Sequence, residues 1–323
     1  MELLNSLPTF TKLFLGLLSI KVLIQNYLDL RQKKSLRFNI DKVPAEFSDL
    51  ITLENHQKAT RYNLERLAFG KFVRSYRLII LVLWTLGGGL ELLGYQIFNG
   101  EISNKTSVFF LLSFIAIETL LGLPVSLYST FKIEQKYGFN KTTPKIFISD
   151  LFKSLLLSVF LVTPLFLGLL YLLELMGEFW WIYSWCAFVL FQILLVFIYP
   201  VFIAPLFNKF KKLDDGALVD GIHQLLSKVN FNASGIFSMD ASKRSTHGNA
   251  YFTGFGKNKR IVFFDTILNQ MDKNEILAIL AHELGHFKKK HILKSMVISF
   301  TVLLGVFYLL SIAIESRAIL KGH

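Results

Sequence analysis

The residues of this chain that could do chemistry are concentrated in one stretch, His282-Glu283-Leu284-Gly285-His286. Residues four apart lie one turn above each other on the same face of a helix, so both imidazoles can bind one metal ion. Glu283 projects from nearly the same edge. H-E-x-x-H is the pattern in which two imidazoles bind zinc and the carboxylate acts as general base toward water. The sequence therefore predicts a hydrolytic zinc site with His282 and His286 as ligands and Glu283 as the catalytic base.

A helix with a clear start must position these side chains. Asp272-Lys273-Asn274-Glu275 places an N-cap acid three residues before a Glu, which is the pattern of a capping box. The apolar residues that follow cover most of the helix circumference: Ile276, Leu277, Ile279 and Leu280. We therefore expect a helix that is buried nearly all round, with its His and Glu side chains in a dry site.

Three other histidines are not expected to bind the metal. His291 lies five residues after His286, so on a continuous helix it points away from the site. His223 and His247 are interpreted as surface or capping histidines. The single cysteine, Cys186, excludes an intramolecular disulfide and a cysteine zinc cluster.

The composition is that of a membrane protein. Of 323 residues, 53% are hydrophobic, whereas about 45–50% is usual in soluble domains even with glycine counted. Six segments are long enough to cross a bilayer, which takes about 20 residues. They are residues 10–28, 78–98, 108–128, 155–176, 180–204 and 292–314. Gly87-Gly88-Gly89 would permit a kink in the second segment.

Basic residues are distributed unevenly between the connections. The formal net charge is +12, and residues 29–76 hold ten Lys or Arg, whereas residues 177–179 hold none. Under the positive-inside rule the first, third and fifth connections face the cytoplasm, and the histidine pair with them. Because the basic residues flank apolar spans, we expect the lipid bilayer as their partner and no nucleic acid.

Between the fifth and sixth spans lies the one segment that resembles a soluble unit. Residues 214–229 are predicted to form an amphipathic helix, and residues 235–239, 250–253 and 260–264 three short strands. Gly254, Gly256 and Asn258 separate the last two strands, as in a hairpin. The predicted domains are residues 1–204, a transmembrane region of five spans with cytosolic loops 29–76 and 129–154; residues 205–291, a cytosolic α+β zinc-peptidase unit; and residues 292–323, the sixth span and its end.

This unit offers a way to bind an extended peptide. A substrate can add as a strand to a free sheet edge, so that backbone hydrogen bonds align its scissile amide. We expect that edge at the start of the second strand, with Asn249, Ala250 and Tyr251 as substrate-binding residues. The alternative is a strand that merely begins with a polar residue.

Four stretches together resemble the Ste24-type CAAX prenyl proteases, membrane zinc metalloproteases of peptidase family M48. They are residues 137–143, 200–207, 249–262 and 282–286. The resemblance implies a mainly α polytopic membrane protein, in which the spans form a helical barrel around a water-filled chamber beside a small cytosolic α+β zinc-metallopeptidase unit. It implies Zn²⁺ on His282 and His286, with Glu283 as the base.

The same resemblance implies an integral-membrane zinc metalloendopeptidase whose active site faces the cytoplasm. Its substrates would be prenylated CAAX proteins, which lose their C-terminal tripeptide, or other membrane-associated peptides. The location would be a bacterial inner membrane, or the endoplasmic reticulum in a eukaryote. Site-2 proteases also use H-E-x-x-H, but within a span, whereas lysines flank the motif here. A metal transporter is disfavoured because the histidines lie outside the spans.

The chain departs from the family in one respect. Members complete the zinc shell with a Glu located well after the sixth span. Here Glu315 is the only Glu that follows His286, and on a continuous helix it lies roughly 43 Å away, so we do not expect it to bind the metal. The third ligand is expected beyond residue 323, in a longer protein. The alternative function is that of a catalytically inactive, incomplete family member that binds client proteins or acts as a scaffold in the membrane.

Overall fold

The chain is a polytopic helical membrane protein with one small β-sheet. A computed structural model describes residues 8–214, 216–254 and 259–321. Within these residues, five helices are long and apolar enough to cross a membrane, or up to six if one bent pair counts as a span. The contacts divide the chain into two units, Met1–Gln96 with Gly122–Tyr137 and Ile97–Leu121 with Gly138–His323.

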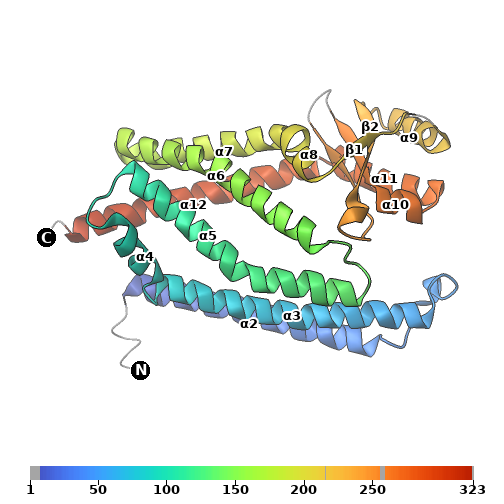
Figure 1. Ribbon diagram of the computed structural model, residues 1–323, viewed down its shortest axis with the longest axis horizontal. Helices are drawn as coiled ribbons and strands as arrows, with labels where there is room; N and C mark the ends of the chain where they lie inside the picture. Colours follow the sequence, from blue (N-terminus) through green and yellow to red (C-terminus); the bar gives the residue numbers. More distant parts are fainter. Residues whose placement is uncertain (1–7, 215, 255–258, 322–323) are drawn as a thin grey trace. The chain divides into compact units, whose positions relative to one another are not determined.

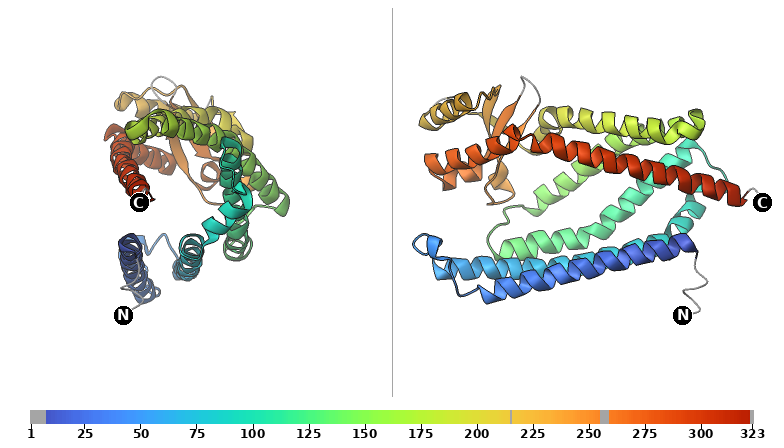
Figure 2. Two further views of the ribbon diagram at one scale, coloured as in Figure 1. Left: turned by 90° about the vertical axis from the view of Figure 1, so that its left-hand side faces the viewer. Right: turned by 180° about the vertical axis from the view of Figure 1, so that it is seen from behind.

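The first unit is built on two long helices, α2 (Thr9–Phe38) and α3 (Leu53–Thr85), which lie side by side (Figures 1 and 2). Arg74 of α3 forms a salt bridge with the buried Asp29 of α2. Both helices extend well into the predicted loop at residues 29–76, because its charged residues continue the helices beyond their apolar parts. After α3 the chain bends by 51° into α4 (Gly89–Phe98). Gly88 lies at the bend with φ +74°, a backbone conformation that favours glycine.

Three spans of the second unit pack in sequence order. They are α6 (Pro144–Leu175), α7 (Trp180–Ile198) and α12 (His291–Lys321), and α7 packs against both of the others. Both views of Figure 2 show α7 and α12 running alongside each other. The indole Nε1 of Trp185 donates to the carbonyl of Phe300 across this pair at 2.9 Å. The helix α5 (Asn104–Tyr128) contributes residues to both units and continues into a π-helical turn, η2 (Ser129–Glu134).

The second unit also carries the sheet. From α7 the chain passes through a second π-helical turn, η4 (Tyr199–Ile203), and the short α8 (Ala204–Phe207). Four strands then follow in the spatial order β1-β2-β4-β3, with β2 and β4 parallel and the outer pairs antiparallel. The three predicted strands are β2 (Gly235–Met239), β3 (Ala250–Thr253) and β4 (Arg260–Phe264). The first strand, β1 (Phe210–Lys212), was not predicted, because three residues are too few to show an alternating pattern.

The hydrophobic core of this unit lies between the sheet and three helices. They are α9 (Ala217–Lys228), α10 (Asp265–Gln270) and α11 (Lys273–Lys288). One sheet face packs against them through a buried cluster that includes Ile222, Ile236, Ile261, Phe263, Ile267, Ile276 and Leu280. The opposite face carries a smaller cluster around Met239, Ala241 and Val262. Two of the predicted hairpin-breaking residues, Gly256 and Asn258, lie outside the described residues, and Gly254 has φ +86°.

Arg244 ties the sheet to the membrane helices of this unit. Its Nε and Nη2 donate to the two carboxylate oxygens of Asp150 in α6 at 2.7 and 2.9 Å. Its Nη1 donates to Asn208 Oδ1, and Nη2 also donates to the carbonyl of Phe207 at the end of α8, both at 2.8 Å. The backbone carbonyl of Arg244 accepts hydrogen bonds from the N–H of Lys141 and the hydroxyl of Thr142, in the segment before α6. A planar guanidinium is required, because only its fixed fork of donors reaches all these acceptors.

We expect Arg244→Ala to lower the free energy of unfolding by about 2–3 kcal/mol, because several charge-assisted hydrogen bonds are lost and Asp150 remains unpaired. Arg244→Lys keeps the charge but not the fork, so it should lose about 1–2 kcal/mol. The measurement is thermal unfolding in detergent micelles. Lys243→Ala removes a neighbouring, more exposed pair with Asp240 and should cost about 1 kcal/mol or less. Equal losses in all three variants would contradict a special role of the Arg244 fork.

Candidate metal centre

The helix α11 carries the predicted metal ligands, and its start is as predicted. The side chain of Asp272 accepts from the N–H groups of Asn274 and Glu275, and Glu275 accepts from the N–H of Asp272. This capping box fixes the first turn of the helix, as the sequence indicated. Figure 1 shows α11 beside the sheet, and the helix packs against α9 and β3.

The prediction that the histidines lie in a dry, buried site is wrong. The buried residues of α11 are Ile276, Leu280 and Leu284, spaced by four, whereas His282 and His286 are exposed. At 100° per residue, His282 lies about 200° from Leu280, so the histidines are on the face opposite the buried row. Ala278 and Gly285, which lie near the histidines on the same face, are also exposed. The face of α11 that carries both histidines is therefore open rather than enclosed by the packing of the helix.

The two histidine rings converge as a metal pair requires. His282 Nε2 and His286 Nε2 are 3.2 Å apart. Two nitrogen ligands at about 2.0–2.1 Å from one zinc ion, at a near-tetrahedral angle, lie roughly 3.4 Å apart. The spacing of four residues on α11 therefore produces the donor separation that a shared zinc ion needs.

Glu283 follows His282 directly and is half-buried. Within the part of the chain that the structure describes, its carboxylate has no hydrogen-bond or salt-bridge partner. A carboxylate that accepts no hydrogen bond from a neighbouring donor has oxygen atoms available to accept a proton. This fits the predicted role of a general base.

His291 contacts His286 through the ring nitrogen that does not face His282. Its Nδ1 lies 3.0 Å from Nδ1 of His286. The continuous helix assumed for this stretch is not present: Lys289 ends α11, and Lys290 adopts a left-handed conformation with φ +54° before α12 begins. This turn brings His291 back against His286. If Nε2 of His286 binds a metal, its Nδ1 carries the proton and donates to His291, which fixes the orientation of the ring.

An aromatic cluster joins the metal helix to the edge of the sheet. Phe287, which follows His286, packs edge-on against Phe231 with ring centroids 4.8 Å apart, and Phe231 packs against Phe252 of β3 at 5.1 Å. Lys259 lies over Phe287 and Phe231, with its Nζ 4.4 and 4.9 Å from the ring centroids. The cluster therefore sets the position of α11 relative to β3.

The strand β3 is an outer strand of the sheet, as predicted. The N–H of Phe264 donates to the carbonyl of Asn249, so Ala250 and Phe252 direct their N–H and C=O groups away from β4, toward the free edge. The side-chain Oδ1 of Asn249 accepts from the N–H of Ala250 at 2.9 Å. Asn249 thus covers one of the backbone donors that a substrate strand would use.

The phenol of Tyr251 lies on the face of the sheet opposite α11. Its ring packs against Phe264, and its hydroxyl contacts the sulfur of Met239. Burial raises the pKa of this phenol to about 12, with a smaller contribution from Tyr199. The side chain therefore points away from the metal helix and stays protonated at neutral pH.

The other histidines lie apart from the pair. His223 is exposed on α9, and the ring of His247 stacks on Phe139 with centroids 4.4 Å apart. Among the described residues, no group of three or more His, Cys, Asp or Glu side chains could hold a metal ion. The side chain of Glu315 is not among those that the structure describes. Two convergent imidazoles are thus the donors that the described residues supply.

Comparisons with known proteins match almost the whole chain. Residues 32–209 match the family model of the CAAX prenyl protease N-terminal region with five membrane helices, and residues 212–321 match the model of peptidase family M48. A CAAX prenyl protease 1 homolog from Arabidopsis thaliana is 37% identical over 87% of this chain and 68% of its own length. The CAAX prenyl protease 1 of Saccharomyces cerevisiae is 37% identical over 85% of this chain and 63% of its own length.

The fold agrees with a solved structure of such a relative. A crystal structure of Ste24p from S. mikatae superposes with a TM-score of 0.83 at 35% sequence identity, over 90% of this chain and 69% of that one. The chain spans about two thirds of the length of the relatives that it matches.

The contact between His291 and His286 leads to a prediction about metal affinity. His291→Ala should weaken zinc binding by about 10–100-fold, because the partner that orients His286 is lost. Affinity is measured by competition with a chromophoric chelator, independently of any activity. His223→Ala removes an exposed histidine from α9 and should leave the affinity unchanged. Zinc binding by His291→Ala that is as tight as in the unaltered protein would show that the contact does not support the ligand.

Proposed function

Because the chain belongs to the CAAX prenyl proteases of peptidase family M48, we propose that it is an integral-membrane zinc metalloendopeptidase. His282 and His286 hold the metal, and Glu283 is the catalytic base. The observation that supports this most directly is the 3.2 Å separation of the two Nε2 atoms on the exposed face of α11. Family membership alone would leave the assignment of these three residues open.

Each side chain has a separate task. When bound, zinc supplies an activated water and polarises the scissile carbonyl. Glu283 takes the proton from the attacking water and delivers it to the departing amine, which must be protonated to leave. His291 holds the proton-bearing Nδ1 side of His286, so that Nε2 keeps its direction.

The substrate is an extended peptide that adds to the free edge of β3. Its backbone would pair with the outward N–H and C=O groups of Ala250 and Phe252, and Asn249 would turn its amide from Ala250 to the peptide. The names of the relatives describe them as CAAX prenyl proteases, which supports prenylated CAAX proteins as the substrate class. Other membrane-associated peptides are the second candidate class.

The metal helix lies on the cytoplasmic side in this proposal. The basic connections between spans support this orientation through the positive-inside rule. The membrane is the endoplasmic reticulum in a eukaryotic host, or the inner membrane in a bacterial one. We also propose that the peptidase unit at residues 205–291 is the cytosolic domain between the fifth and sixth spans.

The metal site requires one more ligand. Catalytic zinc is usually held by three protein side chains, and the described residues bring two together. We propose that a carboxylate side chain outside the described residues is the third. The alternative function, that of an inactive client-binding or scaffold protein, is supported by the same two-ligand set.

Replacing Glu283 separates these functions. Glu283→Gln should retain zinc, because the histidines are untouched, and should lose cleavage of a prenylated CAAX peptide by about 10²–10⁴-fold, because the amide cannot accept the proton. Zinc content is measured by elemental analysis and cleavage by mass spectrometry of the released tripeptide.

The matched control is Asp220→Asn, which neutralises an exposed carboxylate on α9 and should leave both quantities unchanged. Cleavage that persists in Glu283→Gln would remove this residue from the mechanism. A zinc-loaded, unaltered protein that cleaves neither prenylated nor unprenylated peptides would favour the scaffold function.

The role of the sheet edge can be tested separately. Asn249→Ala should raise KM for a peptide by roughly 2–10-fold with little change in kcat, because one hydrogen bond to the substrate backbone is lost. Tyr251→Phe is the control, since its phenol lies on the opposite face of the sheet. An unchanged or lower KM in Asn249→Ala would show that the amide only covers the N–H of Ala250.

A further inference from the structure

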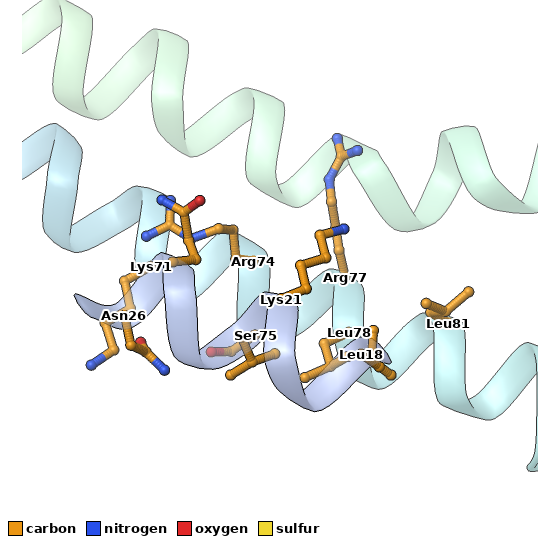
Figure 3. A pocket seen from close by; sticks show the side chains of 11 residues that line it. Leu18, Lys21, Asn26, Lys71, Arg74, Ser75, Arg77, Leu78 and Leu81 are labelled. Carbon is orange, nitrogen blue, oxygen red and sulfur yellow. The ribbon is translucent and has the colours of Figure 1, made fainter. Parts of the chain in front are cut away.

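A cavity of about 270 Å³ lies between α2 and α3 in the first unit, on elements that carry none of the proposed catalytic residues. Figure 3 shows its lining. It combines basic and polar side chains with apolar ones, and both helices contribute each kind. Its volume is near the lower limit of about 300 Å³ for small-molecule sites, so it suits a compact group rather than a peptide.

The helical repeat places the basic residues of the cavity together. On α3, Lys71, Arg74 and Arg77 are spaced by three, so they lie on neighbouring turns of one side. On α2, Lys21 comes one turn before Gln25, which donates to the carboxylate of Asp29. Figure 3 shows Lys21 and Arg77 extending toward the same side of the helix pair. Four cationic side chains thus line one cavity.

Most of this charge is not neutralised within the unit. Arg74 is paired with Asp29. In the part of the chain that the structure describes, Lys21, Lys71 and Arg77 have no salt bridge. Like charges gathered at one cavity repel each other, and a bound anion relieves that repulsion. The cavity therefore has a surplus of positive charge that a phosphate group would offset.

The position along the helices indicates the source of the anion. In α3 the basic run ends at Arg77, and the apolar run of the span begins at Leu78. Of the apolar residues of the cavity, Leu18 precedes Lys21 on α2, and Leu78 and Leu81 follow Arg77 on α3, so these three lie on the side of the apolar run. Basic side chains that are followed directly by apolar ones are suited to bind a phospholipid. The phosphate would lie beside the basic side chains at the membrane surface, and the acyl chains would lie beside the apolar part of the span.

We propose that this cavity binds the headgroup of an anionic phospholipid. The guanidinium of Arg77 offers a fork of donors to phosphate oxygens, and Lys21 and Lys71 add point charges from the two helices. Leu18, Val22, Leu78 and Leu81 contact the first part of the acyl chains. The site would fasten the first two spans to each other, since both helices contribute to it. It does not depend on the metal centre.

The test measures stabilisation by lipid. The full chain in detergent micelles is titrated with phosphatidic acid, with phosphatidylcholine or with inorganic phosphate, and its melting temperature is recorded, since a ligand of the folded state raises it. We expect phosphatidic acid to raise the melting temperature, and the other two to have little effect. The double variant Lys21→Gln/Arg77→Gln should require roughly 30-fold more phosphatidic acid for the same shift.

The matched control is Lys33→Gln/Lys58→Gln. It removes the same charge from the same two helices at exposed positions outside the cavity and should respond to phosphatidic acid like the unaltered protein. If both double variants lose the response equally, the effect is general electrostatics and the proposal is overturned. It is also overturned if the cavity variant responds normally, or if inorganic phosphate stabilises as well as the lipid.

Discussion

The forked salt bridge between Arg244 and Asp150 is the interaction on which the arrangement of the second unit depends. Its four-stranded sheet is small, with strands of three to five residues. The sheet face opposite α11 carries only a small buried cluster around Met239, Ala241 and Val262. The guanidinium of Arg244 joins the sheet to Asp150 near the start of α6 and to the end of α8. The backbone carbonyl of Arg244 accepts hydrogen bonds from the connecting segment at residues 141–142. Since the guanidinium is planar, it fixes direction as well as distance.

Hydrophobic packing determines where the face of α11 that carries the two histidines points. Ile276, Leu280 and Leu284 press one side of the helix against α9 and the sheet, and Phe287 locks its end onto Phe231. Each proposed ligand follows a buried leucine by two positions: His282 follows Leu280, and His286 follows Leu284. Two positions along a helix correspond to about 200°, so both histidines lie on the face opposite the buried leucines. The same packing that stabilises the unit therefore leaves both histidine side chains exposed.

Local features of the chain could be predicted from the sequence, whereas contacts between distant segments could not. The capping box, the three longer strands, five of the six spans and the family follow from short-range patterns, and the structure or the comparisons confirm them. The remaining predicted span, residues 78–98, corresponds to the bent pair of α3 and α4. The Arg244 fork could not be predicted, because Asp150 lies 94 residues earlier and nothing local indicates the pairing. The prediction of a dry site was wrong. It was based on the number of apolar residues around α11, whereas the buried residues are spaced by four and cover only one face of the helix.

The turn after α11 links the histidine pair to a membrane span. Lys290, with φ +54°, lets α12 start with only two residues between it and α11. A membrane span thereby begins with the residue that contacts His286. The span is in turn held against α7 by the hydrogen bond from Trp185 to Phe300. Because His291 is the first residue of α12, a tilt of this helix moves His291 with it. The geometry of the proposed metal pair therefore depends on how that span packs.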